Sequence, residues 1–301
     1  MAKGLKSLFK GDRKGYLFVL PALIFMLALV GFPILYNFVL SVYNQDVITM
    51  GQHSEHFIGL QNYIDLFQVP TTRTSIVNTI VFTAGSILFQ FVIGFALALL
   101  FHMKFKLAKP LRGILLISWM IPVTVTALLS KFMLSSGGGV INTILLALHL
   151  ISKPLDFLAT SELAMPSIIG VNVWIGIPFN MILLTTGLSN ISESYYEAAA
   201  VDGANVVQRF FKITLPLMKA SMLSVIILGV IYTFKVFDLV YVGTGGGPVD
   251  ATELLSTYAY RLSFTQYSFS KGSAAANILF LMLFVVGIVY IKLVGKDEVM
   301  S

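Results

Sequence analysis

Apolar residues gather in long runs that short polar stretches separate. A bilayer-spanning helix needs about 20 apolar residues, and six runs reach that length: residues 16–43, 76–101, 111–134, 164–188, 217–242 and 272–293. The first run is too long for a signal peptide, and no small-residue cleavage site follows it, so we expect it to remain as a helix. The pattern predicts an all-α integral membrane protein with six transmembrane helices.

Two shorter apolar segments lie outside the six runs, and the apolar residues of the first recur at helical spacing. FIGLQNYIDLF (residues 57–67) reads as a short amphipathic helix on the outer membrane surface. VINTILLALHLI (residues 140–151) is too short to span and is expected to be interfacial or packed against the bundle. The run at 217–242 reaches full length only by including Lys235 and Asp238.

Composition agrees with a membrane protein. The 301 residues are 57% hydrophobic and 11% charged, whereas roughly a quarter of the residues of a soluble domain are charged. The chain has no cysteine, which excludes disulfides, Cys–zinc sites and cysteine catalysis.

The net charge of +6 encodes topology rather than nucleic-acid binding. Fourteen of the twenty Lys and Arg lie in the N-terminal tail, in alternate loops and in the C-terminal tail; five lie in the other loops, and Lys235 lies within a run. The positive-inside rule therefore predicts cytoplasmic N and C termini. We divide the chain into a cytoplasmic tail (1–15), a membrane domain (16–294) with a cytoplasmic loop at 192–216, and a second tail (295–301).

That loop contains EAAAVDGANVVQRFFKITLP (residues 197–216), which reads as a helical hairpin. Ser194 and Glu197 fit a capping box, Asp202–Gly203 fit the turn, and Pro216 fits the first turn of the next helix. Val206, Val207, Phe210 and Phe211 are expected on one face of the second helix, with Arg209 and Lys212 pointing away. A packed loop in which Glu197 is only a cap remains the alternative.

The hairpin resembles the EAA loop of binding-protein-dependent ABC importer permeases, whose pattern is EAA, Gly and a hydrophobic stretch ending in LP. The matching residues are Glu197, Ala198, Ala199, Asp202, Gly203, Ala204, Ile213, Leu215 and Pro216. The resemblance implies the type I importer permease fold and coupling helices that dock on a separate ATPase. We assign coupling to Glu197, Ala198, Ala199, Asp202, Gly203 and Phe210.

Other segments resemble the carbohydrate branch of that family, and within it the larger maltose-importer permease: FDLVYVGTGGGP (237–248), WIGIPFNMILLTTGLSNI (174–191) and FIGLQNYIDLF. The chain lacks that permease's extra N-terminal spans and large outside domain. The resemblance implies partners: two ATPase subunits, a second homologous permease and an extracytoplasmic sugar-binding protein, besides membrane lipid. ATP and Mg would be bound by the ATPase, with no cofactor in this chain.

Polar and aromatic residues on two neighbouring spans form a candidate substrate path: Asn172, Gly176, Phe179, Tyr232, Thr233 and Val236. Amides and aromatic faces suit a neutral sugar, and the resemblance implies that these positions line the sugar site. Taken singly, Asn172 and Gly176 are also typical of close helix packing.

The remaining charged and Gly-rich segments are assigned no catalytic or metal-binding role. Lys235 and Asp238, three residues apart on one helical face, are expected to neutralise each other as a structural or gate-related pair. TGGGP and SSGGGV lack the following Lys–Ser/Thr of a phosphate loop, and His53, Glu55 and His56 are expected to be solvated rather than metal-bound.

Rival functions stay open. An ion-coupled secondary transporter would use Lys235–Asp238 as a relay, but such folds show inverted repeats that this sequence lacks. A membrane enzyme would need a catalytic cluster within the spans, and none is found. Within the importer class, a polyol or glycerol phosphate is the alternative cargo, although the candidate path has no arginine for a phosphate.

Overall fold

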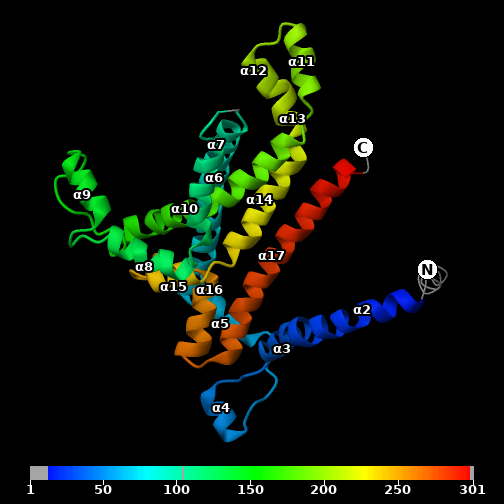
Figure 1. Cartoon of the computed structure of the whole chain (residues 1–301). Coiled ribbons are helices and arrows are strands. Elements are labelled where there is room, and N and C mark those ends of the chain that lie inside the picture. Colours follow the sequence, from blue (N-terminus) through cyan, green and yellow to red (C-terminus); the bar gives the residue numbers. More distant parts are fainter. Residues whose placement is uncertain (1–12, 104, 299–301) are drawn as a thin grey trace. The chain divides into compact units, whose positions relative to one another are not determined.

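A computed structural model describes residues 13–103 and 105–298 (Figure 1), and these residues form helices joined by short loops. The outermost parts of the two predicted tails, residues 1–12 and 299–301, lie outside the described residues. Four helices are long and apolar enough to cross a membrane: Phe18–Leu40, Pro70–His102, Ser161–Ser189 and Phe269–Lys292. Two bent helix pairs raise the number of spans to six if each pair is one span, which agrees with the six predicted runs.

The sequence predicted one helix for the run at 111–134, but the structure has two helices there. Helix α7 (Ala108–Met120) and helix α8 (Val123–Met133) meet at 96° across Ile121 and Pro122. Pro122 has no N–H for the helical ladder and its ring disfavours the helical conformation of the residue before it, and Ile121 is extended (ψ 130°).

The run at 217–242 is also broken. Helix α14 (Lys219–Phe234) ends before Lys235, and helix α15 (Asp238–Gly243) begins three residues later. Lys235 lies in the break and Asp238 is the first residue of α15, so the prediction that they share one helical face is wrong. At the other end, α14 follows the segment Val206–Leu217 at a bend of 63°.

The helices divide into two compact units. The first comprises Met1–Leu66, described from Arg13, together with Ala259–Asn277. It contains α2 (Arg13–Met26), the π-helix η1 (Leu27–Gly31), α3 (Phe32–Leu40), α4 (Val47–Gln52), α5 (Gln61–Gln68, up to Leu66), η3 (Arg261–Thr265) and the start of α17 (Phe269–Glu298). Helix α5 confirms the short helix predicted from FIGLQNYIDLF.

A polar network holds this first unit together. Asn37 of α3 donates to the Asn277 side chain of α17 (2.6 Å), whose amide nitrogen donates to the Tyr63 hydroxyl of α5 (3.1 Å). Tyr63 also hydrogen-bonds Ser41 (2.8 Å). The amide and hydroxyl groups satisfy one another, so the network fixes three helices that carry few buried apolar residues. In the same unit Asp46 is the N-cap of α4, and its carboxylate accepts a hydrogen bond from the Thr49 backbone N–H (2.8 Å), which lowers the pKa of Asp46.

The second unit comprises Phe67–Tyr258 and the chain from Ile278 onward. Its centre is the pair α6 (Pro70–His102) and α10 (Ser161–Ser189), against which α7, α8, α14 and α15 pack. Helix α9 (Val140–Ala147) lies in the segment VINTILLALHLI, whose interfacial or packed position stays a prediction, and α16 (Leu255–Tyr260) lies at the end of the segment Phe67–Tyr258. Buried clusters of Phe82, Ile168 and Leu239, and of Ala98, Leu184 and Val225, fill its interior.

Small residues let α6 and α10 approach closely. A Cβ atom on Gly94 would lie 2.7 Å from Asn180 Cβ and 3.2 Å from the backbone nitrogen of Met181. Small residues at such positions are the usual device for packing membrane helices, where the hydrophobic effect does not drive helices together.

The Gly-rich loop between α15 and α16 is held against α6. The Asn78 side chain donates to the carbonyls of Asp250, Ala251 and Glu253 (3.0, 3.2 and 3.1 Å), and Thr71 donates to the Asp250 carboxylate (2.7 Å). The loop is thus an ordered cap on the second unit.

Candidate coupling hairpin and transport path

The segment between α10 and α14 is a helical hairpin, as predicted (Figure 1). Helix α11 (Glu193–Val201) is followed by a turn and then by α12 (Val206–Arg209), the π-helix η2 (Phe210–Thr214) and α13 (Leu215–Leu217). Gly203 has a φ of 76°, the left-handed conformation that the Asp202–Gly203 turn was expected to need. Pro216 lies in the first turn of α13, also as expected.

The capping box predicted between Ser194 and Glu197 does not form. Ser192, not Ser194, is the N-cap of α11, and its hydroxyl accepts a hydrogen bond from the Ser194 backbone N–H (3.4 Å). The capping box stands instead at the second helix, where Asn205 and Gln208 bond each other's backbone N–H groups (2.8 and 2.9 Å). The spacing Asn-x-x-Gln was a signal for it in the sequence.

Glu197 therefore has no capping role. Its side chain is exposed, and among the residues that the structure describes it has no hydrogen-bond or ion-pair partner. Ala198, Asp202 and Gly203 are exposed beside it, and Ala199 is half-buried. The alternative in which Glu197 serves only as a cap is thus contradicted, and its carboxylate is available to a partner.

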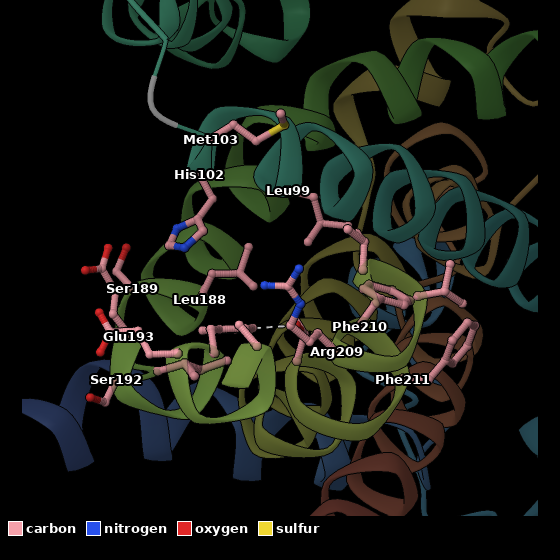
Figure 2. Close-up of a pocket in the computed structure, with 17 residues that line it drawn as sticks. Leu99, His102, Met103, Leu188, Ser189, Ser192, Glu193, Arg209, Phe210 and Phe211 are labelled. Atoms are coloured by element: carbon pink, nitrogen blue, oxygen red, sulfur yellow. Dashed lines mark hydrogen bonds between the residues drawn. The ribbon is translucent and has the colours of Figure 1, made fainter. Parts of the chain in front are cut away.

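An open pocket of about 1260 Å³ lies between the hairpin and the ends of α6 and α10 (Figure 2). Apolar side chains supply most of its lining, including Leu99, Leu188, Phe210 and Phe211. Arg209, which was expected to point away from the apolar face, instead reaches into this pocket (Figure 2).

One contact closes the hairpin and another joins it to α6. The Tyr196 hydroxyl of α11 hydrogen-bonds the Thr214 hydroxyl of η2 at 2.9 Å, closing the hairpin on itself. The Phe210 ring lies 6.1 Å from the Phe95 ring of α6. Phe210 therefore connects the hairpin to a spanning helix, and its role in coupling stays a prediction. Val201, Val206 and Phe211 remain exposed and form an apolar surface suited to a protein partner.

Three of the candidate path residues are covered by neighbouring helices. Asn172 and Thr233 are buried, at 6% and 4% exposure, and a Cβ atom on Gly176 would overlap the Gln90 side chain of α6. Gln90 also donates to the Asn172 carbonyl (2.8 Å). The Asn172 amide nitrogen is buried and has no acceptor among the described residues. Sequence reasoning missed Gln90, a polar residue within a spanning helix.

The aromatic path residues are in contact. Phe179 of α10 lies 5.9 Å from Tyr232 of α14, edge to face, and Tyr232 is 55% exposed. Val236, half-buried in the break after α14, packs against the cluster around Leu239. The structure thus brings Phe179 and Tyr232 to an accessible face and leaves Asn172, Gly176 and Thr233 in the interface behind it. A role in substrate binding stays a prediction for all six.

Charged groups elsewhere form no metal site. The part of the chain that the structure describes contains no cluster of three or more His, Asp or Glu able to hold a metal ion, His53, Glu55 and His56 included.

These features define a multi-pass, all-helical membrane permease with a hairpin inserted between two spanning segments. Residues 90–294 match the family described as binding-protein-dependent transport system inner membrane component. The chain belongs to this family, and is thus an inner-membrane component of a binding-protein-dependent transport system.

Relatives match over nearly the whole length. The chain is 33% identical to the trehalose/maltose transport system permease protein MalF of Thermococcus litoralis. The aligned region covers 97% of this chain and 96% of that protein. The chain is 31% identical to the diacetylchitobiose uptake system permease protein DasB of Streptomyces coelicolor, covering 94% and 87%. A bacterial ABC transporter that imports the acidic polysaccharide alginate has the same fold, with a TM-score of 0.81 at 24% identity over 97% and 98% of the two chains.

Proposed function

We propose that this chain is one of two permease subunits of an ATP-driven importer that carries a sugar or oligosaccharide inward. The observation that carries the proposal is the hairpin with an exposed, unpartnered Glu197 and an exposed apolar surface, in a chain of this family. Relatives named as sugar permeases support the cargo class, among them those for trehalose/maltose, sulfoquinovosyl glycerol and diacetylchitobiose.

The hairpin would lie on the cytoplasmic side, as the positive-inside rule predicts, and would dock on one of two ATPase subunits. ATP-driven closure of the ATPases would move Phe210, and through Phe95 the helix α6. A second permease would complete the path, and a sugar-binding protein outside would deliver the cargo. The movement is a shift between conformations, so each partner must bind one conformation better than the other.

Affinity purification of the tagged chain from its native membrane tests the assembly. We expect an ATPase and a second permease to co-purify, and ATP hydrolysis by the complex to rise when a sugar-loaded binding protein is added. A chain that purifies alone and stable, without an ATPase, would contradict the proposal.

The hydrogen bond between Tyr196 and Thr214 yields a prediction about coupling. Tyr196→Phe removes this bond, which is worth about 1 kcal/mol. Its loss shifts the equilibrium between the closed and the open hairpin about fivefold toward the open one. We expect the amount of sugar transported per ATP hydrolysed to fall several-fold in proteoliposomes containing the complete importer.

Tyr195→Phe is the matched control. Tyr195 is the preceding residue, is 57% exposed, and has no hydrogen bond from its hydroxyl among the described residues. It should leave the ratio of transport to hydrolysis unchanged. Equal ratios in the two variants would show that closure of the hairpin plays no part in coupling.

A further inference from the structure

The pocket of about 1260 Å³ beside the hairpin combines apolar walls with a cationic side chain (Figure 2). Leu99 of α6 and Leu188 of α10 line it where these spanning helices end, and Phe210 of η2 lines it from the hairpin. Arg209 extends its guanidinium group into the same space (Figure 2). The pocket therefore offers a cation in largely apolar surroundings.

The guanidinium group of Arg209 lacks an acceptor. Its Nε atom is buried and has no hydrogen-bond partner among the residues that the structure describes, and those residues form no ion pair with it. A buried charged donor without an acceptor is costly. The planar fork of an arginine matches a phosphate or carboxylate group, which it binds through two parallel hydrogen bonds. The pocket is thus suited to an anionic group.

Two carboxylates also line the pocket, and neither satisfies Arg209. Glu193 is engaged in an interaction within the chain. Glu197 is exposed, has no partner among the described residues, and is the side chain that we assign to the ATPase. Arg209 is therefore the group that decides the charge of a ligand inside the pocket.

The pocket lies at the level of the phospholipid headgroups. Helix α6 has 33 residues and α10 has 29, or about 50 and 44 Å of helix, more than the roughly 30 Å of the hydrocarbon core. The ends of both helices consequently extend out of the hydrocarbon, and the pocket adjoins these ends. A lipid whose chains lie along α6 would place its phosphate at this level.

The loop that follows α6 independently indicates contact with lipid. Exposed apolar side chains alternate there with lysines: Met103, Phe105 and Leu107 are 64%, 37% and 62% exposed, and Lys106 and Lys109 are exposed as well. Met103 also lines the pocket. Apolar side chains combined with basic ones are typical of segments in the headgroup layer, where they contact acyl chains and phosphates. The pocket thus opens beside a segment suited to a membrane surface.

We propose that this pocket is a phospholipid-binding site, in which Arg209 binds the phosphate and the acyl chains lie against Leu99 and Phe210. A free phosphate ion would leave the apolar walls in water, and the pocket is larger than the roughly 300–1,000 Å³ of sites for drug-sized ligands. The lipid would touch both elements that the contact between Phe210 and Phe95 joins. This site is independent of the solute that the chain carries.

Native mass spectrometry of the detergent-purified chain, alone and in the complete importer, tests the proposal without sugar or ATP. The probe is dioleoyl phosphatidylglycerol, and two matched probes each lack one half of it: dioleoylglycerol has no phosphate, and inorganic phosphate has no chains. We expect one phosphatidylglycerol to bind that an excess of neither matched probe displaces. Arg209→Gln should weaken this binding about tenfold to a hundredfold, the loss of hydrogen bonds to a charged group.

Lys212→Gln is the matched control. Lys212 has the same charge, lies three residues after Arg209 on η2, is exposed, and does not line the pocket. Its removal should leave binding unchanged. Ala200→Trp is a second pocket variant, because Ala200 is exposed on α11 and lines the pocket. The indole would occupy the space of the lipid while Arg209 stays in place, and binding should fall again.

Three results would overturn the proposal. Equal binding by the unmodified chain, Arg209→Gln and Ala200→Trp would show that the lipid binds elsewhere. Displacement by inorganic phosphate would assign the pocket to a free anion. Binding to the chain alone but not in the complete importer would show that a partner subunit fills the pocket. An importer that binds the lipid and transports no sugar would contradict the proposed function and leave this site standing.

Discussion

Replacing Glu197 with lysine should abolish sugar uptake while the chain still inserts in the membrane and assembles its helices. The carboxylate is exposed and without a partner within the described residues, so the change costs the permease itself little. A lysine would present a like charge to any cation that the ATPase offers Glu197, and removing one member of a buried charge pair at an interface costs several kcal/mol. Uptake in proteoliposomes and co-purification of the ATPase measure the effect.

Two variants separate the effect of the charge at Glu197 from the effects of side-chain size and of position along α11. Glu197→Gln keeps the shape and, because Glu197 is not a cap, removes only the charge. We expect uptake to fall at least tenfold. Glu193→Lys makes the same charge reversal one turn earlier on α11. It costs roughly 0.3–1 kcal/mol for an unfavourable charge at a helix N-terminus, besides the interaction that Glu193 makes within the chain, and uptake should persist. Normal uptake in Glu197→Gln would show that the carboxylate's charge is not used in coupling.

Replacing Gly94 with leucine should prevent α6 and α10 from packing. The new side chain would meet the Cβ atom of Asn180 and the backbone nitrogen of Met181, neither of which can swing aside. Overpacking a well-filled interior costs about 1–3 kcal/mol, and contact with backbone puts this site at or above the upper end. We expect a large loss of properly folded protein, measured by the thermal stability of the detergent-purified chain and by its yield.

Gly170→Leu is the matched control for that experiment. Gly170 lies on α10, and a Cβ atom there would find no heavy atom within 4 Å. Its stability should equal or slightly exceed that of the unmodified chain, because leucine is the better helix former. Equal stability of the two leucine variants would contradict the close packing of α6 and α10 at Gly94.

Hydropathy predicted where the spanning segments lie but not where they break. A hydropathy average over a sequence window sums the transfer energies of side chains and ignores the backbone. A single Pro122 or Lys235 therefore lowers it only slightly. The breaks arise from the backbone: Pro122 lacks an N–H, and the chain after Phe234 turns before α15 begins. The pair Lys235 and Asp238 was misplaced for the same reason.

The candidate site was predictable only where the pattern is local. The hairpin, its Gly203 turn and Pro216 follow from residues close in sequence, and the sequence also held the Asn205–Gln208 cap. Gln90 could not be found in this way, because its importance comes from its hydrogen bond to the carbonyl of Asn172, 82 residues away. Tertiary packing decides which polar and aromatic residues of a span face one another.

The most direct measurement of the central claim is the energy source of uptake by the reconstituted importer. The account predicts that labelled sugar accumulates only with ATP inside and the sugar-binding protein outside, that an uncoupler leaves accumulation intact, and that Glu197→Lys abolishes it. Accumulation that survives removal of ATP but stops with the uncoupler would contradict the account and establish an ion-coupled transporter in its place.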